Sequence, residues 1–266
     1  MENVLPSLRI RPAPSWRAVL LPKEHGSWSL ALEPLAFGLI AAPSAAGAAL
    51  AVTVTAAFLA RRPLRLAMLE TKPERRTVAR RAFVSCTLVA AVAMAAAVAL
   101  GGWNWLIWLT PALIAGGFFL AFDLRNAGRE EPAEVAGATA FALLPAAFAI
   151  LAGRTPVVAI ALAMLMCGRA VPTVLCIRAA LRIAKKVTVS TTPALLSAAL
   201  ALVAAVALAR HGVAPWFAVI ATAMLAVRAV LWLALPRPAL RGSTLGMIEA
   251  ILGVVFVVGI AATWPE

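Results

Sequence analysis

Four ionisable residues stand inside long apolar stretches of this chain: Glu33, Arg169, Arg228 and Glu249. If these stretches cross a membrane, each charge near the bilayer centre costs at least about 2.5–3.5 kcal/mol and persists only when it is paired or serves a function. Arg228 has the deepest position of the four. For it, a structural Arg–Glu pair between helices and a functional role are equally good interpretations.

The densest polar cluster beside an apolar stretch is Lys23-Glu24-His25, which opens the first of them. His25, Ser29 and Glu33 follow one another at intervals of four residues, so they share one face of a helix. A polar face on an otherwise apolar helix favours a cavity lined by water or ligand. A contact of His25 with lipid headgroups is the simpler alternative.

Two further clusters are rich in arginine. Arg125 and Arg129 lie in a polar joint at 123–134 and could reach an anionic headgroup or phosphate, whereas the carboxylates at 130–134 suit the positive end of the helix that follows. Arg178 and Arg182 lie one turn apart, and like charges at this spacing repel unless an anion or a carboxylate lies between them.

These clusters predict a binding site for an anion at one end of a helix bundle. We assign to it Lys23, Glu24, His25, Glu33, Arg125, Arg129, Arg169, Arg178 and Arg182. The cations among them are expected to converge at the mouth of one cavity, and the alternative is that each extends separately to headgroups. The acids are too scattered to form a metal site, so we expect no metal and no cofactor, and the sequence assigns no catalytic residue.

The elements that must position these residues are nine apolar stretches, most of them near the ~20 residues that cross a bilayer as a helix. They cover 28–42, 44–60, 83–101, 103–122, 135–152, 156–177, 189–209, 215–235 and 245–264. The first two are short and join at Pro43, where a hairpin is preferred to one long helix. Together they predict an all-α integral membrane protein: a basic tail over 1–20 and a single nine-helix domain over 21–266.

The positive charges of the chain follow a strict alternation. Of the 24 Lys and Arg residues, 20 lie in the N-terminal tail or in every second joint. Arg154 and Arg210 lie in the intervening joints. This positive-inside pattern places the N-terminus in the cytoplasm and the C-terminus outside. Anionic membrane lipids at the cytoplasmic face then account for the net charge of +13, and we expect no nucleic acid as a partner.

Composition agrees with a membrane location, because 63% hydrophobic residues exceeds the roughly 45–50% of soluble domains. Cys86, Cys167 and Cys176 lie within predicted spans without paired spacing, which favours small buried residues over disulfides or a zinc site. The sequence contains no GxGxxG, P-loop, HExxH or GxSxG motif. We expect no signal peptide, since no cleavable apolar region follows the basic tail.

The stretch Pro22-Lys23-Glu24-His25-Gly26-Ser27-Trp28 resembles the signature of the YwiC-like family of bacterial membrane proteins. The likeness extends through Arg125-Asn126 and through Arg169, Arg178 and Arg182. This family is distantly similar to the UbiA superfamily of nine-helix membrane prenyltransferases. The resemblance implies a UbiA-like bundle with a central cavity, in the cytoplasmic (inner) membrane of a bacterium.

The chain departs from UbiA enzymes where their two Asp-rich motifs hold Mg²⁺ against an isoprenyl diphosphate. The corresponding regions, 61–74 and 178–186, are rich in Arg and Lys instead. Diphosphate and carboxylates share a site only with divalent cations between them. We therefore expect a protein that binds an amphipathic anion directly through arginine, such as a phospholipid, isoprenoid phosphate or quinone precursor. The alternatives are a small-anion transporter or channel and a divergent prenyltransferase.

Overall fold

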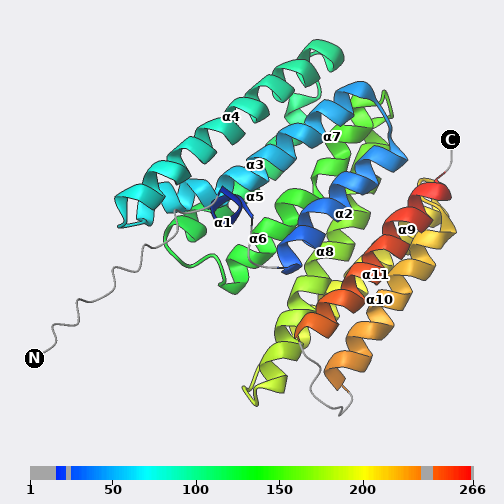
Figure 1. The fold of residues 1–266 in the computed structure, drawn as a ribbon. Helices are drawn as coiled ribbons and strands as arrows, with labels where there is room; N and C mark the ends of the chain where they lie inside the picture. The colour runs from blue at the N-terminus through cyan, green and yellow to red at the C-terminus, as the bar shows by residue number, and fades with distance from the viewer. Residues whose placement is uncertain (1–15, 22–24, 235–241, 265–266) are drawn as a thin grey trace, which may run out of the picture.

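The computed structural model describes residues 16–21, 25–234 and 242–264, and the regular secondary structure of these residues is entirely α-helical. The helices are α1 (Trp16–Leu20), α2 (His25–Ala41), α3 (Ala45–Leu69), α4 (Pro73–Gly101), α5 (Leu106–Leu124), α6 (Glu131–Ala142), α7 (Leu144–Leu151), α8 (Pro156–Ala184), α9 (Thr192–Arg210), α10 (Trp216–Ala234) and α11 (Gly242–Ala262). Figure 1 shows the long helices running back and forth between two ends of the molecule.

Eight of the nine predicted spans correspond to helices long and apolar enough to cross a membrane. These are α3, α4, α5, α6 together with α7, α8, α9, α10 and α11. The first predicted span corresponds to α2, whose apolar stretch Trp28–Ala41 is shorter. The part of the chain that the structure describes is thus a multi-pass helical membrane architecture.

Several helices continue beyond the predicted spans. α3 runs on through Arg61, Arg62 and Pro63 to Leu69, α4 begins at Pro73 rather than 83, and α8 extends to Ala184. Hydropathy marks only the part of a helix that lies in hydrocarbon, whereas Arg, Leu, Ala and Glu sustain a helix in water equally well. The joints predicted at 61–81 and 178–186 are therefore largely helical.

The predicted hairpin between the first two spans is present. α2 ends at Ala41, and the side-chain oxygen of Ser44 caps α3 by accepting from the Gly47 amide at 2.9 Å. Such a cap satisfies one of the amides that the first helical turn leaves unpaired. The fifth predicted span is also interrupted, at Leu143, because Pro145 lacks the amide that would continue the hydrogen bonding of α6 into α7.

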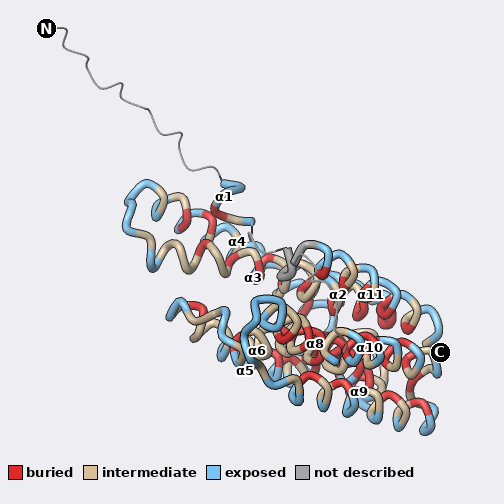
Figure 2. The backbone as a smooth tube through the Cα atoms, turned by 90° about the horizontal axis from the view of Figure 1, so that it is seen from below, coloured by how far each residue is buried: buried red, intermediate tan, exposed pale blue. Residues whose placement is uncertain are grey.

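α8 lies at the centre of the larger part of the molecule, in contact with α2, α6, α7, α9, α10 and α11. α3 and α4 form a second part and pack mainly on each other, so α4 is largely exposed (Figures 1 and 2). Alanine is the commonest buried residue. Small residues allow close helix approach, on which association in a membrane depends because lipid tails are as apolar as the side chains.

The approach of α2 to α7 depends on Gly38. A Cβ atom built there would lie 2.6 Å from Cγ and 2.7 Å from Cδ2 of Phe148, a fully buried ring. The Gly38→Ala variant should therefore lose about 1–3 kcal/mol of stability through overpacking. Thermal unfolding of the purified protein in detergent measures the loss as a lower midpoint temperature.

Gly117→Ala is the matched control, since a Cβ on that helical glycine of α5 meets nothing within 4 Å. Its midpoint should stay the same or rise, because alanine is the better helix former by about 1 kcal/mol. Equal effects of the two variants would contradict this packing.

Candidate functional site

A buried ion network joins four helices of the larger part. Glu249 of α11 accepts hydrogen bonds from Nη1 of Arg169 in α8, at 3.0 Å, and from Nη1 of Arg228 in α10. Nη2 of Arg169 also donates to the backbone oxygen of Glu249 at 2.8 Å. On its other side, Nε of Arg169 lies 3.3 Å from Oε2 of Glu33 in α2. We call these four side chains the ion network.

Two hydroxyl groups complete the ion network. Thr173 accepts from Arg169 and, at 3.4 Å, from Arg228, while Ser29 donates to the Glu33 carboxylate. The exposed side-chain fraction is 2% for Arg169, 5% for Glu249, 8% for Arg228 and 13% for Glu33. Two cations face two anions, so the ion network is balanced in charge.

The ion network lies well below one end of the helices. Glu33 follows the first residue of α2 by roughly 12 Å, and Arg228 precedes the last residue of α10 by roughly 9 Å, at 1.5 Å per residue. A charge at this depth in hydrocarbon is costly unless it is paired. Each pair therefore fixes how its helices are rotated toward one another.

Close helix packing brings the Glu33 carboxylate to Arg169. A Cβ atom at Gly253 of α11 would collide with that carboxylate, at 2.7 Å from Oε2 and closer to the other atoms. The Arg228 guanidinium lies over the Trp232 ring, 5.1 Å from its centroid. The cation–π contact with Trp232 and the salt bridge to Glu249 together stabilise the buried charge of Arg228.

Glu33 and Arg169, which the sequence assigns to the binding site, both lie in the ion network, and their role in binding stays a prediction. The sequence identified both as costly ionisable residues, and the structure pairs Arg169 with Glu33 and with Glu249. Of the two interpretations given for Arg228, the structural pair is the observed one. Thr173 and Gly253 were missed because neither is costly in a membrane.

A second cluster surrounds the joint between α5 and α6. The buried carboxylate of Asp123 lies 3.1 Å from Nε of Arg61 and 3.7 Å from Nη1 of Arg65, both on α3. Nη2 of Arg65 donates to Oδ1 of Asn126 at 2.7 Å, and the Arg61 guanidinium lies 4.8 Å from the centroid of the Phe119 ring. The joint is thereby attached to α3.

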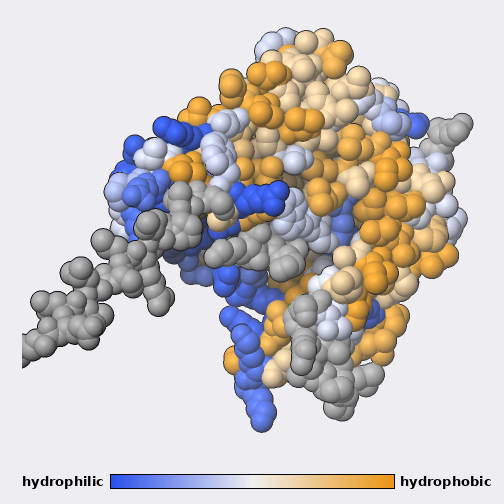
Figure 3. Space-filling view, viewed as in Figure 1, coloured by the Kyte–Doolittle hydropathy of each residue, from blue (hydrophilic) through white to orange (hydrophobic). Residues whose placement is uncertain are grey.

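The same joint is attached to α8 on its other side. Nη1 of Arg178 donates to the backbone oxygen of Arg129 at 2.9 Å and to Oε2 of Glu134 at 2.6 Å. Its Nε lies 3.3 Å from Oε2 of Glu131. We call the arginines of this joint and of the adjoining ends of α3 and α8 the arginine platform: Arg61, Arg62, Arg65, Arg125, Arg129, Arg178 and Arg182. Hydrophilic side chains gather along this edge of the molecule in Figure 3.

Of the predicted site residues, the structure brings Arg129 and Arg178 into contact, at roughly 14 Å along α8 from Arg169 of the ion network. Arg125 belongs to the same joint as Arg129, and Arg182 follows Arg178 by one turn. Arg178 does not need an anion to relieve repulsion from Arg182, because Glu131 and Glu134 already neutralise it. Arg125 and Arg182 are exposed and make no side-chain hydrogen bond or ion pair within the described residues. Lys23 and Glu24 lie outside the described residues, as does the side chain of His25.

Potential metal ligands do not cluster in the described ranges. Within 16–21, 25–234 and 242–264, no three His, Cys, Asp or Glu side chains gather closely enough to hold a metal ion. The carboxylates of both clusters instead face arginine guanidinium groups. What this arrangement offers chemically is direct recognition of an anion by Arg, whose planar fork suits phosphate and carboxylate.

Fold and site define a multi-pass helical membrane protein with a charge-balanced core and an arginine-rich end. The model of the YwiC-like protein family matches residues 21–149, and this segment of the chain is similar to that family. Comparison with curated proteins finds no match, and neither does comparison with solved structures. The matched segment carries Glu33 and the α5–α6 joint, whereas Arg169, Arg228 and Glu249 lie beyond it.

The ion network predicts a graded response to loss of its carboxylates. Glu249→Gln leaves two buried arginines short of their shared partner, at a cost of about 3–5 kcal/mol. Glu33→Gln should cost less, because Glu33 pairs with one arginine and is more exposed. The midpoint of thermal unfolding in detergent measures both.

Two further variants control this experiment. Arg228→Met combined with Glu249→Leu removes one charge of each sign and leaves Arg169 with Glu33, so the double variant should be more stable than Glu249→Gln alone. Glu70→Gln breaks a more exposed pair with Arg75 and should change the midpoint little. The ion network is refuted as a structural element if Glu249→Gln unfolds no earlier than Glu70→Gln.

Proposed function

We propose that this protein binds an amphipathic anion, such as a phospholipid or an isoprenoid phosphate, at the arginine platform. The observation that carries the proposal is the attachment of the α5–α6 joint to α3 by Arg65 and to α8 by Arg178. Arg125 belongs to this joint and Arg182 follows Arg178 by one turn of α8, and both are exposed and without ion partners among the described residues.

The charge of the platform supports the same proposal. Its seven arginines outnumber the four carboxylates of the joint, which are Asp123, Glu130, Glu131 and Glu134. Phosphate bound by guanidinium groups needs no divalent cation, because the protein itself supplies the positive charge. Binding is therefore proposed to be independent of metal, unlike the Mg²⁺-dependent diphosphate binding of UbiA enzymes.

We further propose the orientation that the positive charges favour. α2 is taken as a ninth span, with the N-terminus and the arginine platform in the cytoplasm of a bacterium and the C-terminus outside its inner membrane. Joints at 70–72, 125–130 and 185–191 then share the cytoplasmic side, and Figure 1 draws them at one end of the bundle, with 102–105, 152–155 and 211–215 at the other.

Cysteine labelling tests this orientation. In a variant with Cys86, Cys167 and Cys176 replaced by Ala, single cysteines are introduced as Arg154→Cys and Arg75→Cys. A membrane-impermeant maleimide should label position 154 in intact cells and position 75 only after permeabilisation. Labelling of both positions from the same side would refute nine spans.

Binding is tested with farnesyl phosphate as the amphipathic anion and farnesol as its neutral counterpart, on the full chain in detergent. Arg125→Gln combined with Arg182→Gln should weaken binding of farnesyl phosphate at least tenfold, because charge-assisted hydrogen bonds to phosphate are lost. Arg210→Gln, an exposed arginine at the other end of the bundle, should not weaken it. Farnesol should show no dependence on either change.

Chelation with EDTA belongs to the same titration and should leave the affinity unchanged. Loss of binding on chelation, restored by Mg²⁺, would instead indicate a divergent prenyltransferase. If the Arg125→Gln, Arg182→Gln double variant and Arg210→Gln bind farnesyl phosphate with equal affinity, the arginine platform is refuted as the binding site.

Small-anion transport is the second candidate, and the ion network favours it. A transport path needs charged groups at membrane depth, and the helices that supply Glu33 and Arg169 each contain a proline, Pro34 and Pro172. Flux of chloride and of phosphate through liposomes containing the protein separates the two functions. A flux that Arg169→Gln abolishes would support transport. If the wild-type protein gives no flux, the result supports binding alone.

A further inference from the structure

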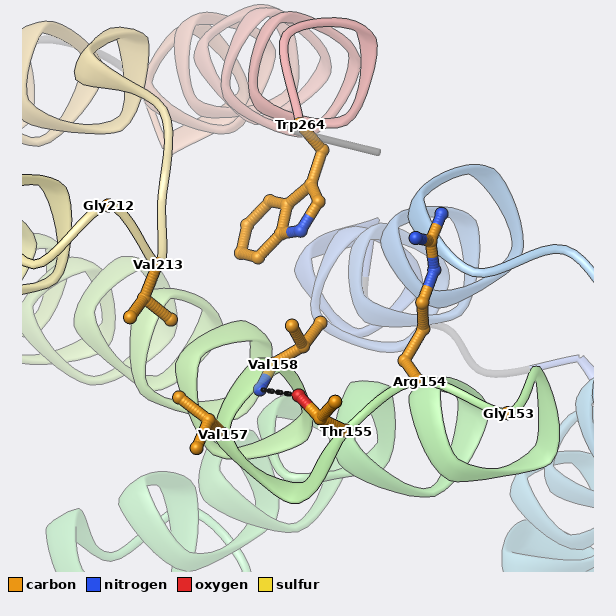
Figure 4. Close-up of a pocket in the computed structure, with 8 residues that line it drawn as sticks. All are labelled: Gly153, Arg154, Thr155, Val157, Val158, Gly212, Val213 and Trp264. Atoms are coloured by element: carbon orange, nitrogen blue, oxygen red, sulfur yellow. Dashed lines mark hydrogen bonds between the residues drawn. The ribbon is translucent and has the colours of Figure 1, made fainter.

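A pocket of about 440 Å³ lies at the end of the bundle opposite the arginine platform. Three segments far apart in the chain enclose it: the turn between α7 and α8, the turn between α9 and α10, and the end of α11. Figure 4 shows the Trp264 indole between Val213 and Arg154, with Val157 and Val158 below it. The pocket shares no residue with the arginine platform or the ion network.

Local structure holds the walls of this pocket in place. Gly153 takes a positive φ of 73°, and the amide of Arg154 donates to the Ala149 oxygen at 2.9 Å, which closes the turn after α7. The Trp264 ring meets Phe37 of α2 edge to face, with centroids 6.4 Å apart. Thr155 is engaged in capping α8, because its hydroxyl accepts from the Val158 amide.

The chemistry of the lining is one cation on an apolar wall. Val157, Val158, Val213 and Trp264 supply apolar surface, and Arg154 supplies the charge. The guanidinium of Arg154 is half-buried and has no hydrogen-bond or ion-pair partner among the described residues. No described Asp or Glu lies in the segments that form this end of the molecule.

Arg154 is also out of place by the charge pattern of the chain. It is one of two cations in the joints on the side that the positive-inside rule keeps poor in Lys and Arg. A positive charge there, half-buried and in one pocket with Trp264, points to an anion that it meets.

We propose that this pocket binds an anionic phospholipid of the leaflet opposite the arginine platform, with the phosphate against Arg154 and an acyl chain over the valines and Trp264. A lipid is favoured over free phosphate because a single cation offers a small anion few contacts, while the apolar wall offers a chain extensive burial. Trp264 in its lining is of the residue type that gathers at the depth of the headgroups.

The test counts bound lipid on the full chain. Protein purified in detergent is titrated with dioleoyl-phosphatidylglycerol, and native mass spectrometry gives the fraction that retains it. Arg154→Gln should reduce the affinity of one bound lipid about tenfold, and Arg210→Gln, an exposed arginine at the same end, should leave it unchanged. Dioleoyl-phosphatidylcholine and inorganic phosphate should not distinguish these variants.

Trp264→Leu supplies a second measurement, since it removes the indole while keeping an apolar side chain. Brominated phosphatidylglycerol should quench the tryptophan fluorescence of the wild type more than that of Trp264→Leu. When both proteins also carry Arg154→Gln, the two should be quenched equally. A variant ending at Trp264 tests whether Pro265 and Glu266 occupy the pocket instead, and unchanged lipid binding by this variant supports the proposal. Equal lipid retention by Arg154→Gln and Arg210→Gln would overturn the proposal and would indicate that the bound lipid is nonspecific annular lipid.

The outcome is separable from that of the arginine platform. Arg125→Gln with Arg182→Gln should leave the lipid at Arg154 in place, and Arg154→Gln should leave farnesyl phosphate binding in place. A protein that fails one test can therefore pass the other.

Discussion

The arrangement of the central helices depends on the fork of Arg169, which holds Glu33 on one side and Glu249 on the other. None of the three groups is tolerated facing hydrocarbon, so α2, α8 and α11 can rotate only within the limits that keep the pairs closed. Arg228 extends this constraint to α10 through the second oxygen of Glu249. Lipid tails are as apolar as leucine, so apolar packing alone discriminates poorly between rotations. The ion network therefore specifies orientation more than it adds net stability.

The α3–α4 hairpin is held to the rest of the molecule in a different way. At the arginine platform the link is polar and peripheral, through Arg61 and Arg65 to Asp123 and Asn126. At the other end it is apolar, where Leu50 and Trp105 belong to one buried cluster. Surface salt bridges contribute little when exposed, but Asp123 is buried and cannot be left unpaired. Its carboxylate thus requires the end of α3 to stay beside α5.

Hydropathy predicted the positions of the eight helices that are long and apolar enough to cross a membrane, because the cost of exposing polar backbone in lipid forces each apolar stretch to be helical. It could not predict where α3 and α8 end, since these helices continue past the hydrocarbon as arginine-bearing turns. Glu33, Arg169, Arg228 and Glu249 were found from their cost alone. Their pairing was not, because it joins residues 136 and 80 positions apart and depends on helix rotation, which composition does not encode. The partner of Arg178 was not predicted for the same reason, as Glu134 lies 44 residues away.

The distribution of charge explains why binding is proposed at the ends of the bundle rather than at its centre. An anion that reached Arg169 would have to displace Glu33 or Glu249, and the released carboxylate would then be buried without a partner, at a cost of several kcal/mol. Arg125, Arg182 and Arg154 have no such competitor among the described residues. A ligand at either end gains its charge-assisted hydrogen bonds without breaking existing ones. Entry of an anion into the centre consequently requires a second arrangement of α2 or α11, in which a carboxylate leaves Arg169 together with its helix.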